Sequence, residues 1–129
     1  MRTLARECVY KFLFSKLFNP TDEGLFSVLC KTLDEKDRKF AEELLKAATE
    51  NETVILERIS ELSAGYKIER IHSTDRIALI IGAAELGQSS DTPVPVIINE
   101  AVGLSAKYSG ETGAGFVNGI LGEYAKRYI

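Results

Sequence analysis

Residues 77–84 read Ile-Ala-Leu-Ile-Ile-Gly-Ala-Ala and, with Gly82 counted, form the longest apolar run of this 129-residue chain. A helix built on this run would have no polar face, and such a helix has to be surrounded by other elements. The run could also form a buried strand, but its length and the helical spacing on both sides favour a helix. We therefore expect a central helix that opens at Ser73 or Thr74.

Three helices are expected before this run, because apolar residues recur there at steps of three and four. The first spans residues 3–18, and a short second one is capped by Thr21-Asp22. The third begins at Asp34 and ends at Ala64-Gly65. Its length of about thirty residues is unusual for one globular helix, so we expect a bend near residues 50–53.

Two further helices are expected after the central one. Thr92–Pro95 is typical of an extended linker, and Pro95 suits the first position of a helix that closes at Ser109-Gly110. Thr112 can cap the last helix. Alternating strand patterns and internal repeats are absent from the sequence. The sequence therefore predicts an all-α fold of about six or seven helices.

Composition is ordinary for a globular protein, with 45% hydrophobic and 27% charged residues. The net charge of −3 argues against a generic polycationic nucleic-acid binder. No stretch approaches the roughly eighteen apolar residues of a membrane span. The N-terminus lacks a secretory pattern, so we expect a cytoplasmic protein in which Cys8 and Cys30 are reduced and packed inside helices.

The basic residues are concentrated at the start of the chain. Residues 1–20 contain four basic and one acidic side chain, whereas residues 21–63 contain six basic and eleven acidic ones. If the chain binds an anion, the first helix is the place to expect it; an ordinary solvated helix face is the alternative.

Signatures of enzymes are missing. The sequence has no phosphate-binding glycine loop, dinucleotide fingerprint, metal-binding histidine pair or nucleophile elbow. One histidine, His72, and two cysteines are too few for a structural zinc site. Gly110, Gly113 and Gly115 are typical of a helix end and a tight turn. We expect no catalysis, cofactor or metal.

Two motifs near the C-terminus are distinctive. One is Ile98–Val102 (INEAV) followed by Ala106-Lys107-Tyr108, and the other is Phe116–Leu121 (FVNGIL). They resemble the INEAVELAK-like and KFVNGVL-like helices of the NusB family of bacterial transcription antitermination factors. Weaker matches to the same family lie upstream, at Ala5-Arg6-Glu7, Asp75-Arg76 and Glu85-Leu86.

The resemblance implies one NusB-like domain over residues 1–129, with a three-helix subdomain in about residues 1–64 and a second in about 65–129. It implies binding of boxA, a single-stranded RNA element of ribosomal RNA leaders, together with NusE, a ribosomal protein of the small subunit. The pair would help RNA polymerase to read through terminators within an antitermination complex. A homodimer is a further assembly that the resemblance allows.

Site residues also follow from the resemblance. Guanidinium groups hold phosphates, aromatic rings stack on unpaired bases, a carboxylate reads an exocyclic amine, and a capped helix start binds a phosphate. The RNA contacts expected on these grounds are Arg2, Arg6, Phe14, Glu100, Thr112 and Phe116. For both phenylalanines, packing in the core is the alternative.

The resemblance places the NusE contact at the start of the central helix. A rim of mixed charge there suits a basic and polar partner surface. The residues concerned are Glu69, Arg70, Asp75 and Arg76. An exposed helix start that binds nothing is the alternative.

The chain departs from the family pattern mainly by losing cations. Thr3 and Leu4 stand where the first helix usually has further arginines, Gly115 stands in place of a lysine, and Ile80 in place of an arginine. Because each lost cation removes a phosphate contact or an ion pair, we expect weak RNA binding without NusE. Two other hypotheses stay open: a protein-binding scaffold with little RNA recognition, and a domain related to ribosomal RNA cytosine methyltransferases.

Overall fold

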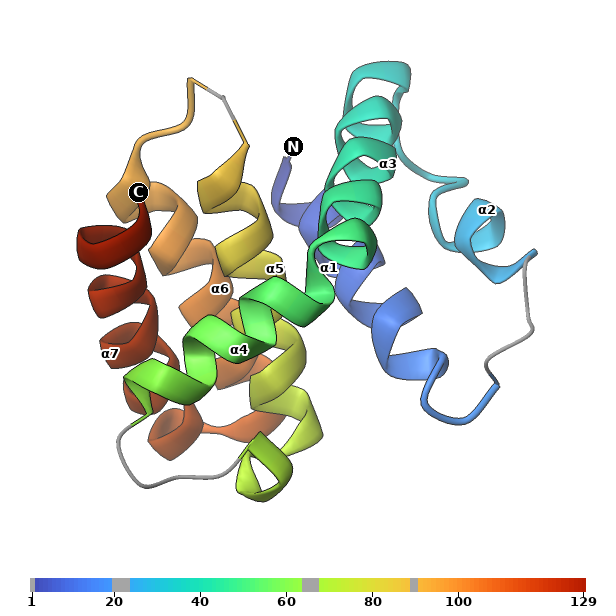
Figure 1. The fold of residues 1–129 in the computed structure, drawn as a ribbon. Helices are drawn as coiled ribbons and strands as arrows, with labels where there is room; N and C mark the ends of the chain where they lie inside the picture. Colours follow the sequence, from blue (N-terminus) through green and yellow to red (C-terminus); the bar gives the residue numbers. More distant parts are fainter. Residues whose placement is uncertain (1, 20–23, 64–67, 89–90) are drawn as a thin grey trace.

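The computed structural model describes residues 2–19, 24–63, 68–88 and 91–129. These residues form helices and contain no strand, as the sequence predicts (Figure 1). The α-helices of the described residues are α1 (Arg2–Ser15), α2 (Leu25–Leu29), α3 (Glu35–Glu50), α4 (Glu52–Leu62), α5 (Ser73–Gly87), α6 (Val94–Ser109) and α7 (Glu111–Tyr128). A short 3-10 helix, η1 (Ile68–Arg70), precedes α5.

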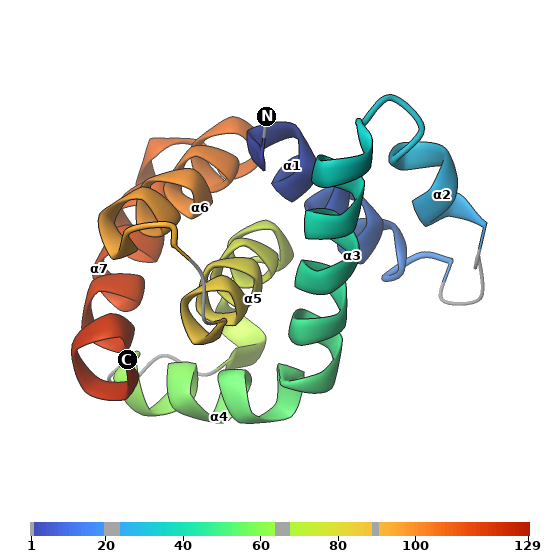
Figure 2. The same ribbon diagram turned by 90° about the horizontal axis from the view of Figure 1, so that it is seen from above.

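Helix α5 is the centre of the fold, which confirms the prediction from its apolar run. Residues 77–86 are all buried, and Figure 2 shows α5 enclosed by α1, α3, α4, α6 and α7. Gly82 makes the close packing feasible. A Cβ at this position would lie 2.6 Å from Cδ1 of Leu121 and 3.0 Å from Cβ of Ala101, so only glycine lets α6 and α7 approach this closely.

The long third helix of the sequence prediction is two helices that meet at Asn51. Asp34 caps α3 as expected and accepts a hydrogen bond of 2.8 Å from the Asp37 amide. At the far end, the Asn51 side chain donates to the Ala47 carbonyl at 2.8 Å. The chain then turns, and α4 crosses in front of α5 toward α7 (Figure 1). The expected ends at Thr21-Asp22 and Ala64-Gly65 lie outside the described residues.

The starts of the last two helices differ from the prediction. Helix α6 begins at Val94, so Pro95 occupies its second position and not its first. Gly110, with φ of +94°, both closes α6 and precedes α7. Its amide donates to the Ser105 and Ala106 carbonyls, and its own carbonyl accepts from Ala114. The prediction that Thr112 caps α7 is therefore wrong, because Thr112 lies inside the first turn of that helix.

Two groups of helices can be recognised. Helices α1, α2 and α3 lie on one side, and α4 to α7 lie on the other (Figure 1). The expected boundary between subdomains, near residues 64 and 65, falls outside the described residues and stays a prediction. Cys30 is buried, and half-buried Cys8 donates its thiol to the Leu29 carbonyl at 3.1 Å. Among the described helices, none is long and apolar enough to cross a lipid bilayer.

Candidate nucleic-acid interface

Arg6 of α1 is buried in a network of carboxylates, with 4% of its surface exposed. Its Nε and Nη2 donate to the two carboxylate oxygens of Glu85 on α5, at 2.7 and 2.6 Å. Its Nη1 donates to Oε1 of Glu100 on α6 at 2.8 Å. Burial alone would lower the pKa of Arg6, but the hydrogen bonds and charges of Glu85 and Glu100 raise it. Arg6 thus joins three helices, and its contact with RNA phosphate stays a prediction.

Glu100 lies against α1, and 26% of its side chain is exposed. Its Oε1 accepts from Arg6 and also from the Thr3 hydroxyl, at 2.6 Å for the latter. The structure therefore brings together two of the residues expected to bind RNA, Arg6 and Glu100.

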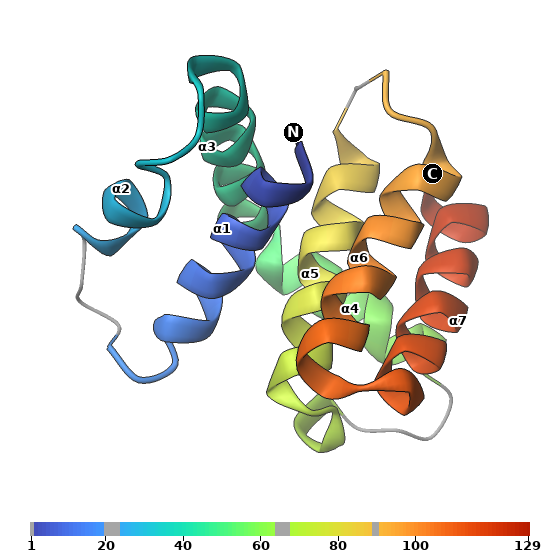
Figure 3. The same cartoon turned by 180° about the vertical axis from the view of Figure 1, so that it is seen from behind.

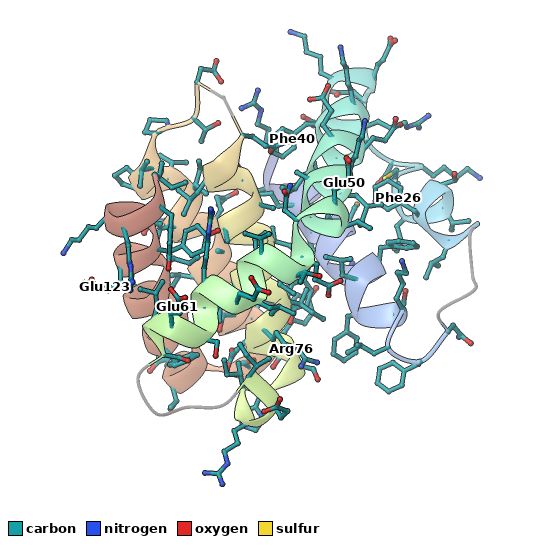
Figure 4. All side chains as sticks on the ribbon, in the orientation of Figure 1. Phe26, Phe40, Glu50, Glu61, Arg76 and Glu123 are labelled. Carbon is teal, nitrogen blue, oxygen red and sulfur yellow. The ribbon has the colours of Figure 1, made fainter. Side chains whose placement is uncertain are left out.

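Arg2 is the exposed cation at the start of α1. Its Nη1 donates to the Thr92 hydroxyl at 2.7 Å and lies 3.5 Å from Asp91. The Arg2 guanidinium lies 4.8 Å from the ring centroid of Phe40 on α3, close to the first turn of α1 (Figure 4). Because almost half of its side chain is exposed, Arg2 is accessible to a phosphate in a way that Arg6 is not.

The α1–α6 contact continues at Glu7, Lys107 and Tyr108. Both Lys107 and Tyr108 donate to Oε2 of Glu7, and the Tyr108 ring stacks on Tyr10 with centroids 4.7 Å apart. Hydrogen bonds from Lys107 and Tyr108 lower the pKa of Glu7. Burial and the Glu7 carboxylate raise the pKa of Tyr108 to about 12.

Apart from the α1–α6 contact, further candidate residues surround a pocket of about 510 Å³ between the starts of α5 and α7. We call it the α5–α7 pocket; its walls include Arg70, His72, Asp75, Tyr108, Thr112 and Phe116. It brings together two residues expected to bind RNA, Thr112 and Phe116, and two expected to bind NusE, Arg70 and Asp75. Tyr108 connects this pocket to the α1–α6 contact, since its hydroxyl bonds to Glu7 there.

Asp75 holds α5, α6 and α7 together. It is buried, and its Oδ1 accepts a hydrogen bond of 2.7 Å from the Ser105 hydroxyl. Its carboxylate lies against Gly113, where an added Cβ would come within 2.4 Å of Oδ1. Gly113 in the first turn of α7 therefore makes room for this buried carboxylate. The rim of mixed charge expected to bind NusE is only partly exposed. Glu69 and Arg70 are exposed, Arg76 is half-buried, and Asp75 is buried.

Comparison with known proteins gives a match to the model of the NusB family over residues 1–126. The chain belongs to the NusB family. The transcription antitermination protein NusB of Acetivibrio thermocellus is 33% identical over 126 residues, which span 97% of this chain and 86% of that protein. This finding confirms the resemblance drawn from the two C-terminal motifs.

Solved structures of NusB agree with the fold. NusB of T. maritima has a TM-score of 0.91 and 29% sequence identity, and the match covers 98% of this chain and 92% of that one. A chain in the crystal structure of antitermination factors NusB and NusE in complex with dsRNA has a TM-score of 0.87 and 25% identity, covering 98% of this chain and 97% of that one.

In this NusB-family chain, Phe14 lies apart from the α1–α6 contact and from the α5–α7 pocket. It is half-buried near the end of α1, and its ring centroid lies 5.5 Å from that of Phe18. Phe116 is half-buried too, but it lines the α5–α7 pocket. Glu85, Lys107 and Tyr108 have no role in the sequence prediction, although all three lie in matched motifs. Their partners are on helices that are distant in sequence, so no local signal indicates these contacts.

Proposed function

We propose that this NusB-family chain binds boxA-type single-stranded RNA together with NusE, the small-subunit ribosomal protein. In this role it would join RNA polymerase in the cytoplasm and promote read-through, chiefly in ribosomal RNA operons. The observation that carries the proposal is the whole-length likeness to a chain of the NusB and NusE structure with dsRNA. Relatives of the chain are named for antitermination and not for a reaction, so we propose no catalytic step.

The geometry supports one RNA path across the molecule. It begins at Arg2, follows the contact between α1 and α6 past Lys107, and reaches the α5–α7 pocket at Thr112 and Phe116. Helices α6 and α7 lie side by side on this face, with α1 beside them (Figure 3). Exposed cations would contact phosphates, and the half-buried Phe116 ring would stack on an unpaired base.

Weak RNA binding by the isolated chain follows from how its cations are paired. Glu85 and Glu100 neutralise Arg6, and Glu7 neutralises Lys107. Because paired cations release few counterions from RNA, their contribution to affinity is small. NusE would supply the missing affinity by binding near Glu69, Arg70 and Arg76 while it holds the same RNA.

Arg2→Ala tests the RNA part of the proposal. We expect it to weaken binding of a labelled boxA-type strand in the presence of NusE and to reduce the slope of log affinity against log salt by about one. Fluorescence anisotropy at several salt concentrations measures both quantities, and Lys126→Ala on the far end of α7 is the control. Sedimentation of the same samples would show a doubled mass if a homodimer forms.

One observation favours the protein-binding scaffold as a second candidate function: the most buried arginine, Arg6, is already occupied by carboxylates. If Arg2→Ala changes neither affinity nor salt slope while NusE still binds, the scaffold becomes the better account. The domain related to cytosine methyltransferases is less favoured, because this chain covers 86% of a relative named for antitermination.

A further inference from the structure

A further pocket, of about 260 Å³, lies where α4, α7 and the end of α5 meet, and we call it the α4–α7 pocket. This end of α5 is opposite to the one proposed to bind NusE, and Figure 2 shows α4 and the C-terminal half of α7 beside it. Among the described residues, its lining includes no carboxylate and no residue of the proposed RNA path. The polar part of the lining comes from Asn51, Arg58, Gln88 and Tyr124.

Two tyrosines of α7 hold the guanidinium of Arg58 in place. Its Nη1 donates to the Tyr124 hydroxyl at 3.2 Å, and its Cζ lies 4.5 Å from the ring centroid of Tyr128. Rings in this position attract a cation and restrict its movement. Both residues of the Arg58–Tyr124 hydrogen bond line the α4–α7 pocket, and Tyr124 is only 1% exposed. The guanidinium edge that meets Tyr124 therefore lies at the wall of the pocket.

Arg58 keeps donors for a ligand. A guanidinium has five N–H groups, and within the described part of the chain Arg58 uses one of them, toward Tyr124, and pairs with no carboxylate. The carboxylate on the same face, Glu61, is engaged elsewhere: its Oε2 accepts from Tyr128 and lies 3.7 Å from Nη2 of Arg127. The side-chain amide of Gln88 is also available, since the described residues bond only to its backbone. Arg58 thus differs from Arg6 and Lys107, whose charges are paired.

The chemistry of the α4–α7 pocket suits one carboxylate. A guanidinium binds a carboxylate through two parallel hydrogen bonds, and one positive charge matches one negative charge. A nucleic acid fits less well, because residues 21–63, which include α3 and α4, contain six basic and eleven acidic side chains that repel a polyanion. Pockets for drug-sized ligands measure roughly 300–1,000 Å³, so this smaller one suits a single side chain. Val54 in its lining is 44% exposed and offers apolar surface to the methylene groups of that side chain.

We propose that the α4–α7 pocket binds an acidic side chain of a partner protein, with Arg58 and Gln88 donating hydrogen bonds to its carboxylate. A protein is a better ligand than a free small carboxylate, because one exposed ion pair contributes little by itself and Val54 offers contact to the chain that carries the acid. The proposal does not depend on RNA binding. A protein docked here would leave α1, α6 and the start of α7 accessible, so it could bind at the same time as RNA.

The probes are N-acetyl-glutamate N-methylamide and its glutamine analogue, which has the same shape without the charge. Each is titrated into the nitrogen-15-labelled chain and followed by NMR. The glutamate probe should shift the amide signals of Val54 and Gln88 and the Nε–H signal of Arg58, and should bind about tenfold tighter than the glutamine probe. Arg58→Gln should abolish this preference. Arg127→Gln is the matched control, because Arg127 also lies over the Tyr128 ring, at 5.5 Å, but does not line the pocket.

Equal binding of the two probes to wild type would overturn the proposal, and this comparison needs no variant, so it holds even if Arg58→Gln does not fold. A preference that survives in folded Arg58→Gln, or that Arg127→Gln also abolishes, would overturn it too. Two further titrations test the choice of ligand. Acetate that binds as tightly as the glutamate probe would contradict a protein as the ligand, and tighter binding of inorganic phosphate would contradict a carboxylate.

Discussion

At the scale of single residues, the buried contact between Arg6 and Glu85 does more for the fold than its surface counterparts. Both side chains are almost wholly covered, and two hydrogen bonds join them across 79 positions of sequence. Desolvating two charges is costly, and their mutual hydrogen bonds offset that cost. Removing Arg6 would take both of these hydrogen bonds from the buried Glu85 carboxylate, and removing Glu85 would leave Arg6 with Glu100 as its remaining carboxylate partner.

We expect Glu85→Ala to lower the free energy of unfolding by about 3–5 kcal/mol, as is usual when one partner of a buried ion pair is removed. Urea denaturation followed by circular dichroism measures this change. Glu123→Ala, which removes an exposed partner of Lys126, should have little effect. Equal effects of the two substitutions would show that the Arg6 network does not stabilise the fold.

Glu7 gives the stability a defined pH dependence. Its carboxylate accepts from Lys107 and Tyr108, which lower its pKa from the ordinary value of 4.5. A lowered folded-state pKa means that the contribution is complete above pH 4.5 and is lost as pH falls through the pKa of the folded state. Glu7→Gln should therefore cost stability at neutral pH and progressively less below pH 4.5. Denaturation of both proteins across this range checks it, and a cost independent of pH would contradict it.

At the scale of elements, the contact of α5 with α6 and α7 depends on Gly82. A larger side chain there meets Leu121 and Ala101, both fully packed. We expect Gly82→Val to destabilise the protein by about 1–3 kcal/mol through overpacking. Gly119→Ala, with open space around it, should instead be neutral or stabilising because alanine favours a helix. Thermal melts measure the melting temperature of both variants. A Gly82→Val variant that melts at the same temperature as Gly119→Ala would contradict this packing argument.

The helices themselves were predictable because their signals are local. The apolar run at 77–84 identifies α5, Asp34 identifies the start of α3, and the bend near residues 50–53 matches Asn51. The start of α7 was misplaced because two local signals compete: Thr112 is a good cap, but Gly110 takes a positive φ and closes α6 first. The site was less predictable, because the partners of Arg6 and Glu7 come from helices 79 to 101 positions away.

At the scale of the whole molecule, the acidic net charge and the proposed RNA binding are compatible. The acidic residues concentrate in residues 21–63, whereas the proposed RNA path uses α1, α6 and the start of α7. Along this path, carboxylates of the protein pair with the buried Arg6 and with the exposed Lys107, so the path presents few unpaired charges to RNA. If the chain binds RNA as proposed, we expect this arrangement to make the binding dependent on a second protein.

The most direct test measures the affinity of wild-type protein for a labelled boxA-type strand and for a scrambled strand, with and without NusE. Our account predicts weak and unselective binding by the chain alone, and tight, salt-sensitive binding of only the boxA-type strand when NusE is present. Tight binding without NusE would contradict the argument from paired cations. Binding of NusE with no preference between the two strands would contradict the proposed function itself.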